Sequence, residues 1–231
     1  MPLQIRIWDL PTRLFHWLLA FSVTGALVTG WIGGNWMGWH ARLGLLIVGL
    51  LAFRLAWGLL GSTYVRFAQL LQLPRSLPAY LRGEWQGGGH NPLGWLSVLT
   101  MLAALTFQAV SGLFASDDIA FVGPLYGLVD SATSDALASL HRQGMWLVMA
   151  LIALHLASLL FYRLAHGEDL VTAMLTGTRQ VPEDRPIAPA RGGRLPALLA
   201  ALVFAGAAVW VAEGRWVPAP PPAPAQSTPA W

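Results

Sequence analysis

Two histidines, His141 and His155, stand in an apolar stretch from Leu140 to Arg163 that is long enough to cross a lipid bilayer. Histidine within a span costs free energy unless it has a partner, which makes it a functional candidate. Fourteen residues of α-helix rise about 21 Å and return to within roughly 40° of the same face. One helix would therefore present two imidazoles on one side, one near each membrane face, as expected if it holds two metal centres stacked across a membrane.

The composition identifies a membrane protein. Hydrophobic residues make up 55% of the 231 residues, charged residues only 11%, and the mean hydropathy is +0.55. Soluble domains carry about 25% charged residues. A chain of this length can supply one bundle of four or five spans and little else. We therefore expect an all-α fold, because at this size only helices satisfy their own backbone within lipid.

Cysteine and lysine are both absent from the sequence. Without cysteine, the chain has no disulfides, no iron–sulfur ligation and no covalent attachment of a c-type haem. All 14 basic residues are arginine, and the net charge of +3 is spread over connecting segments without forming a run. Nucleic acid is therefore not an expected partner.

Five apolar segments of spanning length divide the chain. We expect residues 1–170 to form a four-helix transmembrane bundle, with spans at about 14–33, 40–61, 93–115 and 140–163. The first segment has the flanks of a signal peptide, but it is too long and no small-x-small cleavage site follows, so we interpret it as an uncleaved span. The remaining parts are expected to be a cytoplasmic linker at 171–194, a fifth transmembrane helix at 195–213 and a disordered, Pro-rich periplasmic tail at 214–231.

The arginines in the connections predict the orientation of the bundle. The connection between the second and third spans holds Arg66, Arg75 and Arg82 against one acid, and five arginines follow the fourth span. The connection between the third and fourth spans has four aspartates and no arginine. The N-terminus is therefore expected in the cytoplasm, and five spans place the C-terminus outside.

This orientation assigns a depth to each histidine in a span. The first span begins inside, so His16 lies toward the cytoplasmic face, whereas the second begins outside and places His40 toward the outer face. The fourth span also begins outside, which puts His141 at the outer level and His155 toward the inner level. The four histidines thus form two pairs, each drawn from two helices: His40 with His141, and His16 with His155.

The levels of the inner pair match imperfectly. His155 stands eight residues, about 12 Å along a helix, before Arg163, whereas His16 is only three residues past Arg13. Helix tilt and the reach of arginine side chains toward the interface can absorb a difference of this size.

The chemistry of two imidazoles from different helices favours haem. Zinc normally takes four ligands, and no carboxylate or thiolate shares these levels. Haem iron needs only two axial ligands, and its apolar ring fits between packed helices. Gly44 and Gly144 closely follow the outer histidines and would let a flat cofactor approach the backbone. Four arginines near the membrane edges could pair with haem propionates: Arg13, Arg42, Arg54 and Arg142.

Other roles for these residues stay open. A single histidine in a span can serve as a hydrogen-bond partner between helices, although four histidines in two depth-matched pairs weaken that interpretation. Arginine at the end of a span is also an ordinary topology signal. His90, which stands among glycines in or beside a cytoplasmic loop, and His166, which follows the fourth span, are not expected to be ligands.

Several segments carry a family resemblance. The segments IRIWDLPTRLFHW, WHARLGLLIVGLLAFRLAWGLLGS, HNPLGWLSV followed by QAVSGLF, and LHRQGMWLVMALIALH are similar to the bacterial cytochrome b561 family, which includes the cytochrome b subunit of Ni,Fe-hydrogenases. The likeness covers about residues 4–166. Its most specific elements are the W-D-L-P-T-R-x-x-H-W opening and the two histidines of the fourth span, spaced by 14.

The resemblance implies a four-helix bundle that binds two non-covalent haem b groups, each through two histidines. Carried over by position, His16 with His155 would ligate the inner haem iron, and His40 with His141 the outer one. It also implies a place in the respiratory chain of the bacterial inner membrane. Electrons would pass between the quinone pool and a periplasmic or membrane redox partner, such as a c-type cytochrome or a hydrogenase.

The expected function is therefore a transmembrane electron carrier. With both axial positions filled by histidine, neither iron would keep an open position for oxygen chemistry, and no catalytic residue is assigned. The alternative is an enzyme in its own right, a superoxide:quinone oxidoreductase of the cytochrome b561 type. A transporter is a third class, but the chain lacks broken helices or an inverted repeat.

Overall fold

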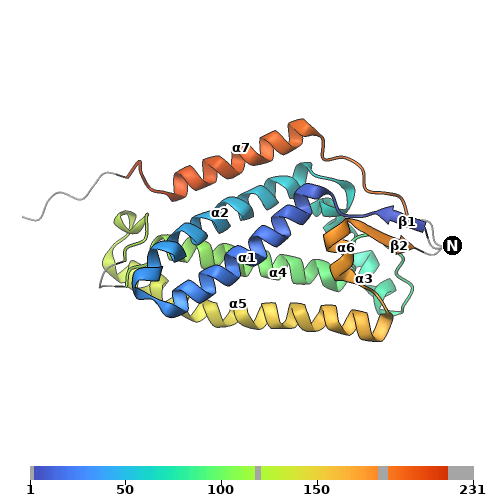
Figure 1. The fold of residues 1–231 in the computed structure, drawn as a ribbon, viewed down its shortest axis with the longest axis horizontal. Helices are drawn as coiled ribbons and strands as arrows, with labels where there is room; N and C mark the ends of the chain where they lie inside the picture. Colours follow the sequence, from blue (N-terminus) through green and yellow to red (C-terminus); the bar gives the residue numbers. More distant parts are fainter. Residues whose placement is uncertain (1–2, 118–120, 182–186, 218–231) are drawn as a thin grey trace, which may run out of the picture.

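The computed structural model describes residues 3–117, 121–181 and 187–217. Five long helices run roughly side by side along the longest axis of the molecule (Figure 1). Each is long and apolar enough to cross a membrane. The expected all-α membrane bundle is confirmed. The five helices are α1 (Leu10–Ile32), α2 (Met37–Leu60), α4 (Pro92–Leu113), α5 (Ser131–His166) and α7 (Leu195–Ala212).

Side-chain caps decide where three of these helices begin. Asp9, Asn91 and Asp130 each accept a hydrogen bond from the backbone N–H three residues further on, at 2.8, 2.7 and 2.8 Å. Such caps satisfy N–H groups that have no partner within the helix. The cap at Asp130 starts α5 at Ser131 rather than near residue 140, where the apolar run begins, so α5 is 36 residues long. The first turns of α5, residues 131–139, therefore precede its apolar stretch.

The helix α2 packs against α1 on one side and α7 on the other, and α5 packs against α4. In Figure 1, α7 lies along α2 at the edge of the bundle opposite α5. Gly49 permits the close approach of α7, because a Cβ atom there would lie 2.8 Å from Cγ2 of Val209. By contrast, α1 and α2 make few close backbone contacts with α5 and face it mainly through side chains.

Short elements gather at the end of the bundle where α1 and α4 begin (Figure 1). They include the helices α3 (Leu73–Leu81) and α6 (Leu170–Thr176) and the antiparallel strands β1 (Leu3–Arg6) and β2 (Thr178–Val181). Short 3-10 helices complete the fold: η1 (Gly34–Trp36), η2 (Thr63–Val65), η3 (Phe67–Gln72) and η4 (Tyr126–Leu128).

The region expected to be a linker, residues 171–194, is thus partly structured. The strand β2 pairs with β1, and the backbone N–H groups of Ile7 and Trp8 donate to the carbonyl of Gly177 at 2.9 and 3.1 Å. These contacts fasten the segment after α5 to the start of the chain. The Pro-rich tail expected at 214–231 lies outside the described residues from 218 onward.

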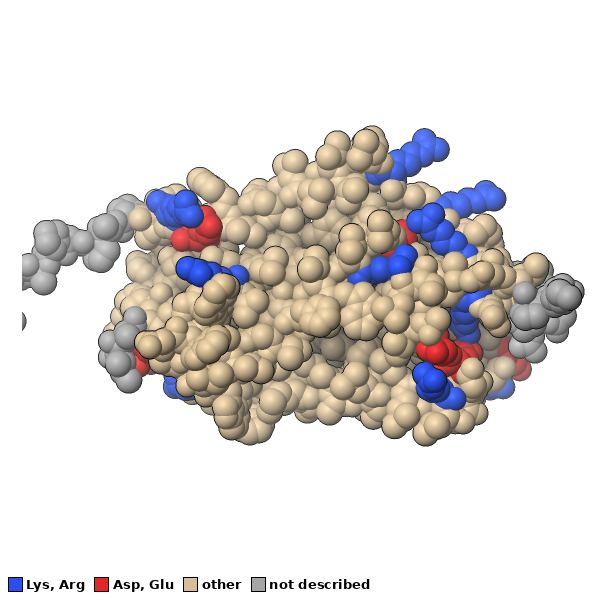
Figure 2. Space-filling view, in the orientation of Figure 1, with Lys and Arg blue, Asp and Glu red and all other residues tan. Residues whose placement is uncertain are grey.

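Charge is distributed unevenly along the bundle. Figure 2 shows most of the arginine side chains on this face at the end that carries β1, β2 and α3. We call this the Arg-rich end and the other the opposite end. A buried apolar cluster underlies the Arg-rich end: Ile7, Trp8, Phe15, Phe53, Trp57, Val65, Ala173 and Ala201. A second lies further along the bundle: Val23, Ile47, Leu51, Leu105 and Val148.

Candidate functional site

The four histidines of the spanning helices meet in two pairs. His16 of α1 faces His155 of α5 toward the Arg-rich end, with ring centroids 6.4 Å apart. His40 of α2 faces His141 of α5 toward the opposite end, with ring centroids 5.9 Å apart. All four rings are half-buried. Helix α5 therefore contributes one imidazole to each pair, as the spacing of 14 residues requires.

Both rings of the His40–His141 pair are oriented by backbone carbonyls. Nδ1 of His40 lies 2.9 Å from the carbonyl oxygen of Ala26, and Nδ1 of His141 lies 2.8 Å from that of Gln108. A carbonyl only accepts, so each neutral ring must carry its proton on Nδ1 and leave the lone pair on Nε2. Imidazoles that ligate metals are commonly held in this way, with the second nitrogen donating to a carbonyl.

Glycines make room for these two rings. A Cβ atom at Gly30 would lie 2.9 Å from the His40 ring, and one at Gly112 would lie 2.8 Å from the His141 ring. The sequence alone points to Gly44 and Gly144 instead, which follow the two histidines along the chain. A Cβ at Gly44 would meet nothing within 4 Å, and Gly144 faces the side chain of Gln108. The relevant glycines belong to the helices that pack against the histidines, which no local sequence pattern reveals.

The His16–His155 pair has different surroundings. Nδ1 of His16 is buried and has no hydrogen-bond partner among the described residues. The ring centroids of His16 and the neighbouring Trp17 lie 5.1 Å apart, and the two rings are nearly perpendicular. No backbone carbonyl fixes the tautomer of His16, so either ring nitrogen can carry the lone pair.

The separation within each pair suits one bound metal ion. Because bonds from a metal to imidazole nitrogen are about 2 Å long, two imidazoles on opposite sides of one ion have ring centroids roughly 6 Å apart. Across the described residues, no three side chains among His, Asp and Glu form a metal-ligand group. The histidines therefore meet in twos, and two is the number of axial positions on haem iron.

Arg54 is the arginine best placed for a buried anion. Its side chain is 4% exposed, and Nη1 has no hydrogen-bond partner among the described residues. The guanidinium lies 4.9 Å from the centre of the Phe67 ring. A buried guanidinium nitrogen without a partner is costly, so an anionic group such as a haem propionate would stabilise it. At the Arg-rich end, Nη1 of Arg54 and Nδ1 of His16 are thus both buried without a hydrogen-bond partner among the described residues. These two unpaired groups fit a haem bound at that end.

The other three arginines named from the sequence are engaged differently. Arg13 donates from Nε to the carbonyl of Met174 at 3.3 Å and from Nη2 to the carbonyl of Leu175, so it caps the C-terminal turn of α6. Arg42 is exposed and lies 5.0 Å from the centre of the Trp39 ring. Arg142 is also exposed.

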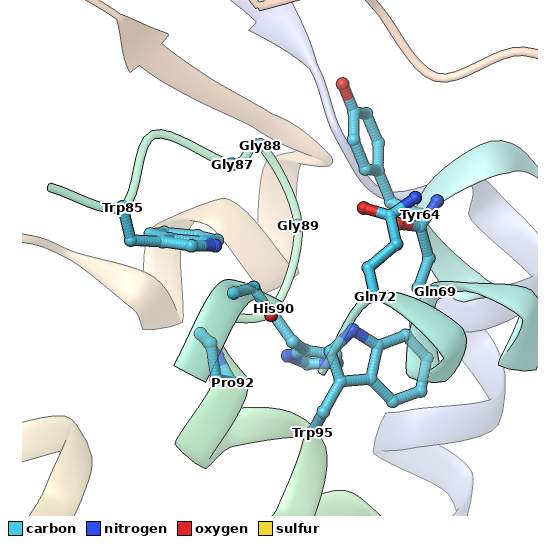
Figure 3. A pocket seen from close by; sticks show the side chains of 11 residues that line it. Tyr64, Gln69, Gln72, Trp85, Gly87, Gly88, Gly89, His90, Pro92 and Trp95 are labelled. Carbon is cyan, nitrogen blue, oxygen red and sulfur yellow. The ribbon is translucent and has the colours of Figure 1, made fainter. Parts of the chain in front are cut away.

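A pocket of about 180 Å³ lies beside His90 at the Arg-rich end. Figure 3 shows Trp85 on one side, Tyr64, Gln69 and Gln72 on the other, and His90 with Trp95 between them. Its wall thus combines flat aromatic surfaces with amide and hydroxyl groups.

His90 is packed between two tryptophans, with ring centroids 4.7 Å from Trp8 and 5.4 Å from Trp95. Burial, followed by the positive charge of Arg54, lowers the pKa of His90 to about 3. His90 is therefore neutral at physiological pH and can donate or accept a hydrogen bond. The sequence assigns His90 no role, because Trp8, which packs on it, comes from the start of the chain and no local pattern links the two residues.

The fold and these sites define a class of protein: a multi-pass helical membrane protein with two paired-imidazole sites stacked along one helix. Comparison with known proteins places it more narrowly. Residues 7–177 match the model of the prokaryotic cytochrome b561 family. The chain therefore belongs to this family, and the resemblance noted from its sequence is confirmed. It is a b-type cytochrome of electron transport, and the cofactor of such proteins is haem b.

Curated relatives are distant but match over most of their length. The chain is 23% identical to the probable Ni/Fe-hydrogenase B-type cytochrome subunit of Azotobacter vinelandii, over 79% of this chain and 91% of that protein. It is 21% identical to the probable Ni/Fe-hydrogenase 1 B-type cytochrome subunit of Escherichia coli K12, over 75% and 89%. No solved structure matches the chain.

Proposed function

We propose that this chain carries electrons across a membrane through two haem b groups, each held by two histidines. His16 with His155 would ligate the haem at the Arg-rich end, and His40 with His141 the haem at the opposite end. The observation that carries the proposal is the meeting of two imidazoles at each of two levels along α5, at separations that suit one iron ion each. When bound, haem supplies a site that gains and loses one electron.

The protein side chains have distinct tasks in this proposal. The carbonyls of Ala26 and Gln108 keep Nε2 of His40 and His141 free to bind iron. Arg54 offers a buried positive charge to a propionate. Because two histidines would hold each haem iron, the chain would transfer electrons without an open site for oxygen chemistry. The second apolar cluster contains Val148, which stands midway between His141 and His155 on α5, and it would keep water out of the space between the two pairs.

We place the Arg-rich end in the cytoplasm of a bacterial cell, at its inner membrane, because arginine-rich connections stay inside. The N-terminus is then cytoplasmic and the C-terminus periplasmic. The names of the relatives support a hydrogenase as redox partner, and a c-type cytochrome would serve the same role. Quinone is the expected exchange partner in the lipid, and the pocket beside His90 offers a neutral hydrogen-bonding group between aromatic rings.

The first test is the haem content of the purified protein. A pyridine haemochrome assay on fully occupied protein should give two haems per chain, removable with acid acetone because no cysteine anchors them. One haem per fully occupied chain would contradict the two-centre proposal. Reduction of quinone by superoxide with the purified chain alone would assign the protein to the alternative class, the superoxide:quinone oxidoreductases.

A further inference from the structure

The segment that contains η3 and α3, residues 67–82, has two chemically different faces. Leu71 and Leu81 are 83% and 71% exposed, and both Pro74 and Pro78 are exposed too. Spacings of three, four and three residues place these four side chains on one helical face. We call them the outer stripe. The other face carries Gln69, Gln72 and Ser76, which line the pocket beside His90. The segment therefore turns its polar side inward and its apolar side outward.

Specific contacts fasten the inner face to the bundle. The hydroxyl of Tyr80 in α3 forms a hydrogen bond with the hydroxyl of Tyr162 in α5. Nδ2 of Asn91 also donates to Tyr162, at 2.6 Å, while Oδ1 of Asn91 caps α4. At the other end of the segment, Gln69 donates to the carbonyl of Thr63 at 3.1 Å. The outer stripe thus faces outward because the polar side is held in place.

The position of the outer stripe indicates what covers it. Tyr80 joins α3 to α5, where Leu160 and Leu164 are 57% and 76% exposed on a helix that spans the membrane. The segment also packs against the start of α4, where Leu93 is exposed. The outer stripe therefore continues the apolar surface that the spanning helices present to lipid.

The charge of the segment supports the same partner. Arg75 and Arg82 are exposed on α3 and just after it, and the nearest acid in the sequence is Glu84, which pairs with Arg82 at 2.9 Å. Helices that lie in a membrane interface combine leucine toward the acyl chains with basic residues toward the lipid phosphates. A water-exposed surface of a soluble loop would not need four apolar side chains in a row along one face.

We propose that residues 67–82 lie in the lipid interface at the Arg-rich end, with the outer stripe inserted in the leaflet and Arg75 beside the phosphates. The inner face then forms a wall one helix thick between lipid and the pocket beside His90. This proposal requires that the chain spans a membrane, and it does not depend on the haem ligands or on quinone.

The absence of cysteine allows a direct test, because a single introduced cysteine carries the only label. Leu71→Cys, Pro78→Cys and Leu81→Cys would each be labelled with an environment-sensitive fluorophore. The full chain would be reconstituted in vesicles of phosphatidylcholine and phosphatidylglycerol. Leu160→Cys in the span of α5 and Glu84→Cys in the exposed loop after α3 are the matched controls. Quenching by lipids with a nitroxide in the upper acyl chain is compared with quenching by aqueous iodide.

Labels at all three positions of the outer stripe should lose most of their emission to the nitroxide lipid, as the Leu160→Cys label does, and little to iodide. The Glu84→Cys label should show the reverse. Iodide quenching at Leu71→Cys and Leu81→Cys equal to that at Glu84→Cys would overturn the proposal. Protection from both quenchers would also overturn it, because a second copy or another protein would then cover the stripe.

Discussion

The two histidine pairs use the same side chain in different surroundings. At the opposite end, His40 and His141 both face a backbone carbonyl at Nδ1. Toward the Arg-rich end, His16 has a buried Nδ1 without a partner among the described residues. The guanidinium of Arg54 is buried at the same end, over the Phe67 ring. A hydrogen bond from Nδ1 makes an imidazole a stronger donor to a metal, which favours the oxidised ion. A buried positive charge favours the reduced one.

The difference has a consequence for the direction of electron flow. Under the proposed ligation, the haem held by His40 and His141 has the lower reduction potential, and the haem held by His16 and His155 the higher. Electrons then move downhill toward the Arg-rich end, where the pocket beside His90 lies. At equilibrium an electron would then reside mainly on the haem at the Arg-rich end, while the net direction of transfer is set by the potentials of the external donor and acceptor.

Removing any one ligand should have the largest effect. In proteoliposomes, a membrane-impermeant reductant outside should reduce an impermeant acceptor trapped inside when the wild-type chain is present. His16→Ala, His40→Ala, His141→Ala and His155→Ala should each abolish this transfer, because either missing centre interrupts the path. His166→Ala, at the exposed end of the same helix α5, is the matched control and should transfer electrons at the wild-type rate. Electron transfer across the membrane that persists in any of the four variants would contradict the proposal that both haems are required.

Replacing Gly112 by alanine should have a smaller effect, confined to the haem held by His40 and His141. Gly112→Ala would place a Cβ atom 2.8 Å from the His141 ring, so the ring must move and the haem at that end should be partly lost. Overpacking of this kind costs about 1–3 kcal/mol. Gly206→Ala in α7 meets nothing within 4 Å and is the control. Haem content and the spectrum of each centre measure the outcome, and equal behaviour of the two variants would contradict the assigned role of Gly112.

The smallest expected effect concerns the buried positive charge of Arg54, which we expect to raise the potential of the haem at the Arg-rich end. Arg54→Gln removes one buried positive charge, which should lower the potential of the haem at the Arg-rich end by roughly tens of millivolts, as expected for one charge acting at an intermediate dielectric constant. The other haem should keep its potential. Arg42→Gln, at an exposed position, should change neither potential by as much. A redox titration in which Arg54→Gln moves both potentials equally would remove Arg54 as the source of the asymmetry.

Much of this arrangement is predictable from the sequence, because lipid imposes strong rules. Apolar length indicates the spans, arginine indicates the sides, and together they assign His16, His40, His141 and His155 to two levels. The imperfect match between His16 and His155 does not prevent their rings from meeting at 6.4 Å. Here the sequence sufficed because each histidine stands in a long regular helix whose rise per residue is known.

The parts that could not be predicted depend on contacts between distant segments. Arg13 is engaged by carbonyls of α6, more than 160 residues further along the chain. The His90 ring packs against Trp8, and the His141 ring packs against Gly112 of α4. The helix α5 begins nine residues before the predicted span at 140–163, because its first turns are more polar and the cap at Asp130 starts them. In each case the decisive neighbour comes from tertiary packing, which apolar length and charge counts do not report.

The pairing of the histidines is the central claim, and a redox titration of the four single variants tests it most directly. The account predicts two groups: His40→Ala and His141→Ala should both lose the component of lower potential, and His16→Ala and His155→Ala should both lose the component of higher potential. Loss of the same component from His141→Ala and His16→Ala would contradict the pairing and, with it, the assignment of one haem to each end of the bundle.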